Sequence, residues 1–152
     1  MDLDEEALRA FVVAAHQNGY AAADADTVEV GGGTRIEYED GPWHYVDQYH
    51  GSRAYLGMEI VTRDDESVWG MHYHGAPTAE DVDHEPVYAF LRDALAATTP
   101  DDPYRGPDGL TDGEWAYHVD VDGTIRRFDG VETVTVAGEC RYRGRFAGGL
   151  ID

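Results

Sequence analysis

The feature that most limits the possible folds is a short segment that the chain contains twice. DGPWHY at residues 40–45 recurs as DGEWAY at residues 112–117, a spacing of 72. Asp-Gly favours tight turns, and the aromatic residues after it favour strands, so each copy predicts a turn that leads into a β-strand. This recurrence predicts two similar structural units within one domain.

The recurrence continues beyond this segment. Five residues of the first copy recur at a spacing of 72: Asp40, Gly41, Trp43, Tyr45 and Gly51. Three more recur at a spacing of 73: Gly57, Glu59 and Val61, which correspond to Gly130, Glu132 and Val134. The one extra residue, near Asp129 and Gly130, predicts a β-bulge.

An amphipathic helix is predicted ahead of each set of strands, because apolar residues follow the i, i+3, i+4, i+7 spacing over 8–15 and 87–94. Asp2 with Glu5 is a candidate cap for the first helix, and the second is predicted to begin near Pro86. We therefore predict an α+β fold of internally duplicated helix-plus-antiparallel-meander units. It would contain a curved antiparallel sheet of about seven strands with two helices on one face. Residues 1–152 would form a single domain, with repeats at about 3–75 and 80–149.

The charge is strongly acidic: 31 Asp and Glu stand against 11 Arg, with no Lys, for a net charge of −20. Hydrophobic residues make up 42%, too many for a disordered chain. An acidic surface spread along the whole chain is tolerable where concentrated salt screens it, so the composition predicts a halophilic, haloarchaeal-type protein. The same charge disfavours direct binding to nucleic acid or to anionic membranes.

The cysteine content and the hydropathy of the chain indicate the cellular compartment of the protein. Cys140 is the single cysteine, so no disulfide within the chain is possible. No apolar run is long enough for a signal peptide or a membrane span, and together these features predict a cytoplasmic protein.

Candidate ligand-binding residues come from strand alternation, which places Trp43, Tyr45, Asp47 and Tyr49 on one strand face. Glu59 and its counterpart Glu132 lie mid-strand among apolar neighbours, where a carboxylate must face water, find a partner or bind a ligand. Aromatic rings beside a carboxylate suit a small organic cation. The predicted ligand-binding residues are Trp43, Tyr45, Asp47, Tyr49, Glu59, Trp69, Tyr73 and Glu132.

Another interpretation stays open: the rings are core beneath the helices, and the glutamates pair with arginines or face solvent. The candidate arginines are Arg53, Arg126 and Arg127.

Gly51 and Gly57 would leave backbone uncovered, where a flat ligand group could approach closely.

The chain also resembles a known family. The residues that carry the resemblance are Tyr45, Asp47, Tyr49, Gly51, Tyr55, Gly57, Glu59, Val61, Trp69, Tyr73 and Gly75, with PYRGP at 103–107 and the closing GGLI. Over about residues 8–151 they are similar to a domain-of-unknown-function family, found alone or fused to helix-turn-helix transcriptional regulators. The resemblance implies a standalone, sensor-like module and carries no activity with it.

Other motifs give weak signals. His72 and His74 share one strand face and are weak metal candidates. GGG at 31–33 lacks the spacing of a phosphate-binding loop, and DVDG at 120–123 lacks the glutamate of a calcium loop. No cofactor motif is present, so no cofactor is expected.

Three functions therefore remain. The first is a small-molecule-binding module with an aromatic and acidic groove. The second is a homo-oligomeric interaction or scaffold protein that uses the aromatic stripe as a homodimer surface. The third is an enzyme with Glu59 or Asp47 as general base, which requires a carboxyl pKa raised towards neutrality.

Overall fold

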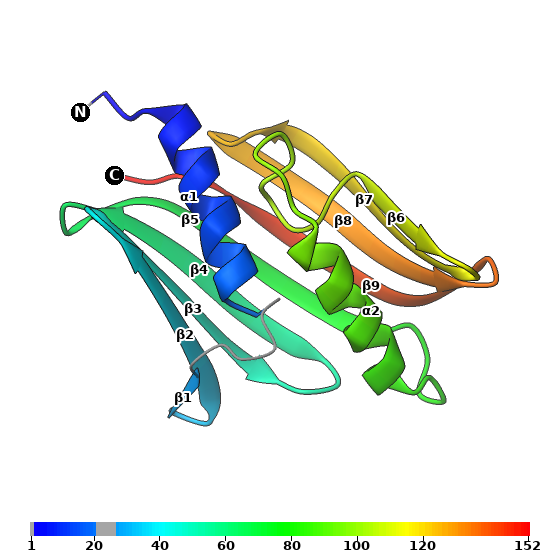
Figure 1. The fold of residues 1–152 in the computed structure, drawn as a ribbon. Coiled ribbons are helices and arrows are strands. Elements are labelled where there is room, and N and C mark those ends of the chain that lie inside the picture. Colours follow the sequence, from blue (N-terminus) through cyan, green and yellow to red (C-terminus); the bar gives the residue numbers. More distant parts are fainter. Residues whose placement is uncertain (1, 21–26) are drawn as a thin grey trace.

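Residues 2–20 and 27–152 are described by the structure, a computed structural model. These residues form one antiparallel sheet of nine strands, with two helices on one of its faces (Figure 1). The elements are α1 (Glu5–Asn18), β1 (Thr27–Val30), β2 (Gly33–Asp40), β3 (Trp43–Gly51), β4 (Tyr55–Arg63), β5 (Glu66–Pro77), α2 (His84–Ala96), β6 (Gly109–Asp112), β7 (Trp115–Thr124), β8 (Arg127–Val136) and β9 (Glu139–Leu150). The strand order is β1-β2-β3-β4-β5-β9-β8-β7-β6, so two meanders meet where β5 pairs with β9.

The predicted fold class is wrong in its strand number and in its repeated unit. The sheet has nine strands instead of about seven, with five strands after α1 and four after α2, so the halves are not copies of one helix-plus-meander unit. The strands missing from the prediction are β1 and β6, the two edges of the sheet. Each has only four, mostly exposed residues: TVEV in β1 alternates, but over the shortest span at which alternation indicates a strand, and GLTD in β6 does not alternate.

Both helices bury the apolar stripe that their sequences predict. In α1 the stripe of Leu8, Phe11, Val12 and Ala15 is buried, and α2 buries the stripe of residues 87–94 in the same way. The predicted cap is wrong: the carboxylate of Asp4 accepts hydrogen bonds from the amides of the first turn of α1, and Asp83 caps α2.

The predicted bulge near Asp129 and Gly130 is also wrong. The pairing of β7 with β8 is continuous through these residues, and the register shift of β8 lies against β9, between Val134 and Thr135. A second shift lies between Val61 and Thr62, where β4 pairs with β5.

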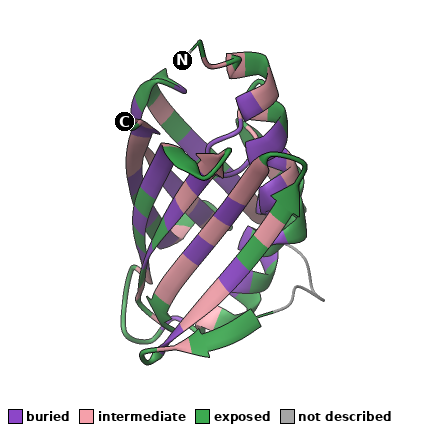
Figure 2. Cartoon of the chain, turned by 90° about the vertical axis from the view of Figure 1, so that its left-hand side faces the viewer, coloured by how far each residue is buried: buried purple, intermediate pink, exposed green. Residues whose placement is uncertain are grey.

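The core lies between the helices and the inner face of the sheet. Buried and exposed residues alternate along the long strands, as Figure 2 shows. Inward residues of neighbouring strands stand opposite one another: Asp47 of β3 is the register partner of Glu59 of β4, and Gly57 is the partner of Tyr73 of β5. This register brings several polar side chains into the space beneath the helices. No helix formed by the described residues has the length and apolar content needed to cross a membrane.

Candidate functional site

A cavity of 510 Å³ opens between α2 and the strands β2 to β5, with Tyr20, which follows α1, and Arg105, which follows α2, also in its wall. Five tyrosines line it, together with charged side chains from α2, from β3 and from the segment after α2. The lining residues that matter most are Tyr20, Tyr49, Tyr55, Tyr73, Tyr88, Asp47, Glu85, Arg92 and Arg105. Its volume and its mixture of aromatic and polar residues are those of a small-molecule site.

Asp47 is the carboxylate that lines this cavity from the sheet. It is only 3% exposed, and the hydroxyl of Tyr73 donates a hydrogen bond to its Oδ1 over 2.5 Å. Burial, followed by the charge of the adjacent Glu59, raises the pKa of Asp47 to about 7. Asp47 therefore exchanges a proton near neutral pH.

Glu59 lies deeper and is tied to α1. Its Oε1 accepts a hydrogen bond from Tyr45 and lies 2.7 Å from Nε2 of His16, although the ring is not aligned for a hydrogen bond. Burial alone would raise the pKa of Glu59, but His16 and the Tyr45 hydrogen bond together lower it, so Glu59 is the carboxylate of the pair that stays ionised. Its other oxygen, Oε2, is buried without a partner among the described residues.

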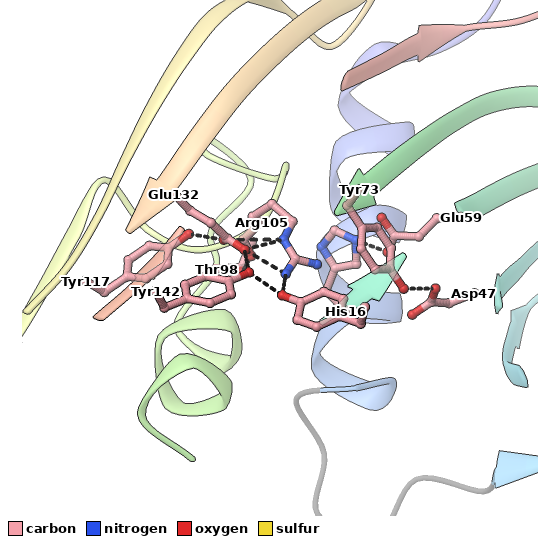
Figure 3. Close-up of polar contacts among 10 residues, drawn as sticks. His16, Asp47, Glu59, Tyr73, Thr98, Arg105, Tyr117, Glu132 and Tyr142 are labelled. Carbon is pink, nitrogen blue, oxygen red and sulfur yellow. Dashed lines mark hydrogen bonds and ion pairs between the residues drawn. The ribbon is translucent and has the colours of Figure 1, made fainter. Parts of the chain in front are cut away.

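On the other side of the site, Arg105 and Glu132 form a buried ion pair (Figure 3). Nη2 and Nε of Arg105 donate to Glu132 over 2.9 and 3.2 Å. Tyr117 and Tyr142 donate to the same carboxylate over 2.8 and 3.0 Å. Burial opposes the charge on Arg105, but Glu132 overcomes it and raises the pKa of the guanidinium. The guanidinium of Arg105 therefore stays charged, with the Glu132 carboxylate as its partner.

The guanidinium of Arg105 also connects the two halves of the site. It lies 4.9 Å from the centre of the Tyr73 ring, and its Nη2 is 3.5 Å from the hydroxyl of Tyr55. Because Tyr142 donates to Glu132, the hydrogen bond between Tyr55 and Tyr142 has Tyr55 as its donor. Burial raises the pKa of Tyr55 and Tyr73, so both stay neutral hydroxyl donors.

A second, much smaller space adjoins the large cavity, and we call it the inner chamber. It has a volume of 20 Å³, room for about one water molecule. Its lining residues are His16, Tyr20, Tyr45, Asp47, Glu59, Leu95 and Arg105. Tyr20, Asp47 and Arg105 line both spaces, so the chamber is the inner end of the large cavity.

The structure divides the predicted ligand-binding residues into three groups. Asp47, Tyr49 and Tyr73 line the large cavity. Tyr45 and Glu59 line the inner chamber, which Asp47 reaches as well.

Trp43, Trp69 and Glu132 line neither space. Trp43 stacks on Phe11 with 5.4 Å between ring centroids, and Trp69 is fully buried with its indole donating to the carbonyl of Ile125. Trp69 is a core residue, and Trp43 is partly buried and packs against the core.

Several residues of the site were missed by sequence reasoning. Arg105 was one of them: the predicted partners of the glutamates were Arg53, Arg126 and Arg127, but Glu132 pairs with Arg105. The only signal for Arg105 was its place in PYRGP, since pairing across 27 residues depends on the tertiary fold. His16 lies on the inward side of α1, one residue beyond the apolar stripe, and shows no motif.

The expectation of uncovered backbone at Gly57 is wrong. A methyl group at Gly57 would lie 2.3 Å from the hydroxyl oxygen of Tyr73, so that hydroxyl already occupies the space above the glycine. Gly75 makes the same kind of room for the hydroxyls of Tyr142 and Tyr55. These glycines therefore allow the tyrosines to reach the buried carboxylates.

The weaker motifs lie away from the cavity. His72 and His74 are exposed on the opposite face of β5, next to Leu56 and Arg145. Within residues 2–20 and 27–152, no group of three or more His, Cys, Asp and Glu is arranged to hold a metal ion. DVDG at 120–123 belongs to the continuous strand β7, not to a loop.

Comparison with known proteins identifies a family. The model of the family described as "Domain of unknown function (DUF5680)" matches residues 47–151, well over half of the chain. The protein belongs to the DUF5680 family. The DUF5680 match begins at Asp47 and includes Glu59, Arg105 and Glu132, whereas α1 with His16 lies outside it. Searches of curated proteins and of solved structures gave no match.

Proposed function

We propose that this DUF5680 protein is a small-molecule-binding module whose cavity takes a small organic cation. The observation that carries the proposal is Asp47, a buried carboxylate at the wall of a tyrosine-lined cavity that forms no ion pair among the described residues. Tyr73 is its hydrogen-bond partner, and the two buried cations nearby, Arg105 and His16, lie against Glu132 and Glu59. Arg92, which also lines the cavity, is exposed and lies over the Tyr20 ring.

A count of buried charges supports this proposal. Among the described residues, three buried carboxylates, those of Asp47, Glu59 and Glu132, stand against two basic side chains, Arg105 and His16. Even with His16 counted as protonated, the interior holds one negative charge in excess. A buried charge without a partner is costly, so this carboxylate either takes up a proton or binds a cation.

The rings around Asp47 suit the same ligand. Tyrosine faces attract cations by about 0.5–2 kcal/mol, and the chain uses this attraction itself, because the guanidinium of Arg92 lies 5.0 Å from the centre of the Tyr20 ring. The net charge of −20 further favours a cation over an anion.

The biological setting belongs to the same proposal. We propose a cytoplasmic, sensor-like module of a salt-accumulating archaeon, related to effector domains of helix-turn-helix regulators. The support is the charge pattern without lysine, the single cysteine and the family resemblance. Recovery of the small molecules that co-purify with the protein from its host would test this setting.

Binding is tested with phenethylamine, its N,N,N-trimethyl analogue and neutral 2-phenylethanol, titrated calorimetrically in molar KCl at pH 8. We expect the cations to bind more tightly than the alcohol. Asp47→Asn should abolish this preference, while Asp122→Asn should retain it, because Asp122 is an exposed residue outside the cavity and loses the same charge. Equal affinity for the alcohol and the cations would refute cation binding.

One observation favours a second candidate, an enzyme in which Asp47 transfers protons. The pKa of about 7 is the property that a carboxyl base needs at neutral pH. Turnover of carbonyl or ester substrates that falls on Asp47→Asn would favour this candidate over a binding module.

The alternative of a homodimer is also retained, but with a different surface. The aromatic stripe of β3 is covered by the helices, whereas Leu56 and Met58 are 58% and 54% exposed on the other face of the sheet. Light scattering in molar salt tests the homodimer.

A further inference from the structure

We infer that the inner chamber is a subsite for a primary ammonium group, so that the ligands of the cavity are primary amines with an apolar or aromatic body. This inference rests on the proposed binding of cations in the cavity and narrows it to one class. It is carried by the size of the chamber, its position and the atoms that line it.

The size of the chamber selects the head group. A space of 20 Å³ accepts one group of the size of a water molecule. An ammonium group has this size, whereas a trimethylammonium group carries three methyl groups and does not fit. A quaternary cation therefore stays in the outer cavity among the tyrosine rings, and only a primary amine reaches the inner end.

The position of the chamber connects it to the ligand. Because Tyr20, Asp47 and Arg105 line both spaces, a molecule with its body against the tyrosines can extend its head group past Asp47. In Figure 3, Arg105 lies in the middle: His16, Glu59 and Asp47 are on one side of it, and Glu132 is on the other side. The side of the site that holds the chamber is therefore the side with the uncompensated carboxylate.

The atoms of the chamber match the donors of an ammonium group. Oε2 of Glu59 and Nδ1 of His16 are buried and have no hydrogen-bond partner among the described residues, whereas Nε2 of His16 faces Oε1 of Glu59 over 2.7 Å. Buried polar atoms without partners are rare and costly, and these belong to side chains only 2% and 8% exposed. An ammonium group has three N–H donors, for which Asp47 and Oε2 of Glu59 supply carboxylate acceptors. A quaternary ammonium has none.

The experiment is a methylation series on the wild-type protein. Phenethylamine and its N-methyl, N,N-dimethyl and N,N,N-trimethyl derivatives are titrated in molar KCl at pH 8, where amines of this kind are protonated. We expect affinity to fall along the series, with the primary amine at least about tenfold tighter than the quaternary ion, because each lost N–H leaves a buried acceptor without a partner.

Two outcomes separate this inference from the proposed function. If all four cations bind equally well, or the quaternary ion binds best, the ammonium subsite is refuted and cation binding stands. If none of them binds, the proposed function itself fails.

The variant Glu59→Gln provides a second test. It should reduce the difference between the primary and quaternary ions while the quaternary ion still binds, and circular dichroism first establishes that it is folded. A folded Glu59→Gln protein with undiminished preference for the primary amine would also overturn the inference. If this variant does not fold, the methylation series decides.

Discussion

Replacing Asp47 with Asn should make the protein more stable at pH 8 while it weakens cation binding. Asp47 is buried beside Glu59, and its pKa is raised from 3.8 to about 7. A carboxyl with a raised pKa stabilises the fold in its protonated form, so its contribution is complete below about pH 4 and is lost as pH rises through 7. Asparagine keeps the acceptor for Tyr73 and never ionises.

The magnitude follows from the size of the shift. About three pKa units at 1.36 kcal/mol each amount to about 4 kcal/mol of stability that the wild type lacks at pH 8 and the variant keeps. For a chain of 152 residues this corresponds to roughly 10 °C in melting temperature. At pH 4, where Asp47 is protonated, the two proteins should melt at similar temperatures.

Thermal unfolding followed by circular dichroism in molar KCl, from pH 4 to pH 8, measures this difference. Titrating groups that do not interact with Asp47 are common to the two proteins and cancel in the comparison. A raised pKa for Asp47 would be refuted if the difference in melting temperature between variant and wild type did not change with pH. It would also be refuted if the variant lost stability relative to the wild type as the pH rose from 4 to 8. Added stability together with lost binding is the pattern expected of a functional residue.

Four further predictions concern the site and its surroundings. Affinity for N,N,N-trimethylphenethylammonium should fall by about tenfold per pH unit below pH 7, since Asp47 then binds a proton. An affinity that calorimetry finds to be the same from pH 5 to pH 8 would contradict this. Glu132→Gln should lower the free energy of unfolding by about 3–5 kcal/mol in chemical denaturation, because it leaves Arg105 charged, buried and unpaired. Gly57→Ala should lower the free energy of unfolding in chemical denaturation, since its methyl group would lie 2.3 Å from the Tyr73 hydroxyl, whereas Gly109→Ala, whose methyl group would meet its nearest atom at 3.7 Å, should change it little. Lowering KCl from molar concentrations to 0.1 M should lower the melting temperature, because the Debye length grows to about 10 Å and the net charge of −20 is less screened; a melting temperature independent of salt would count against halophilic adaptation.

Local patterns in the sequence predicted much of the inward face. Alternation along residues 43–49 placed Asp47 and Tyr49 on one side of a strand, and both line the cavity. The i, i+3, i+4, i+7 spacing located both buried helix stripes. Such patterns work because a strand with one buried face has a period of two and a helix a period of 3.6.

The edge strands were missed for the opposite reason. β1 and β6 have four residues each and are mostly exposed, so their segments are too short to give a clear signal of a buried face, and their pairing with β2 and β7 exists only in the folded sheet. The first half of the sheet has five strands and the second has four. The recurrence of residues in the sequence does not show this difference, because it does not extend to the edge strands.

The sequence by itself determined the acidic charge, the helices and the residues that point inward, because these depend on composition and on neighbours close along the chain. Only the tertiary structure decided which carboxylates are compensated. Arg105 pairs with Glu132 across 27 residues and His16 reaches Glu59 from another element, which leaves Asp47, at the wall of the cavity, without an ion-pair partner among the described residues. Charge compensation depends on distances of a few ångströms in a medium of low dielectric constant, and such distances arise only when helices and sheet pack together.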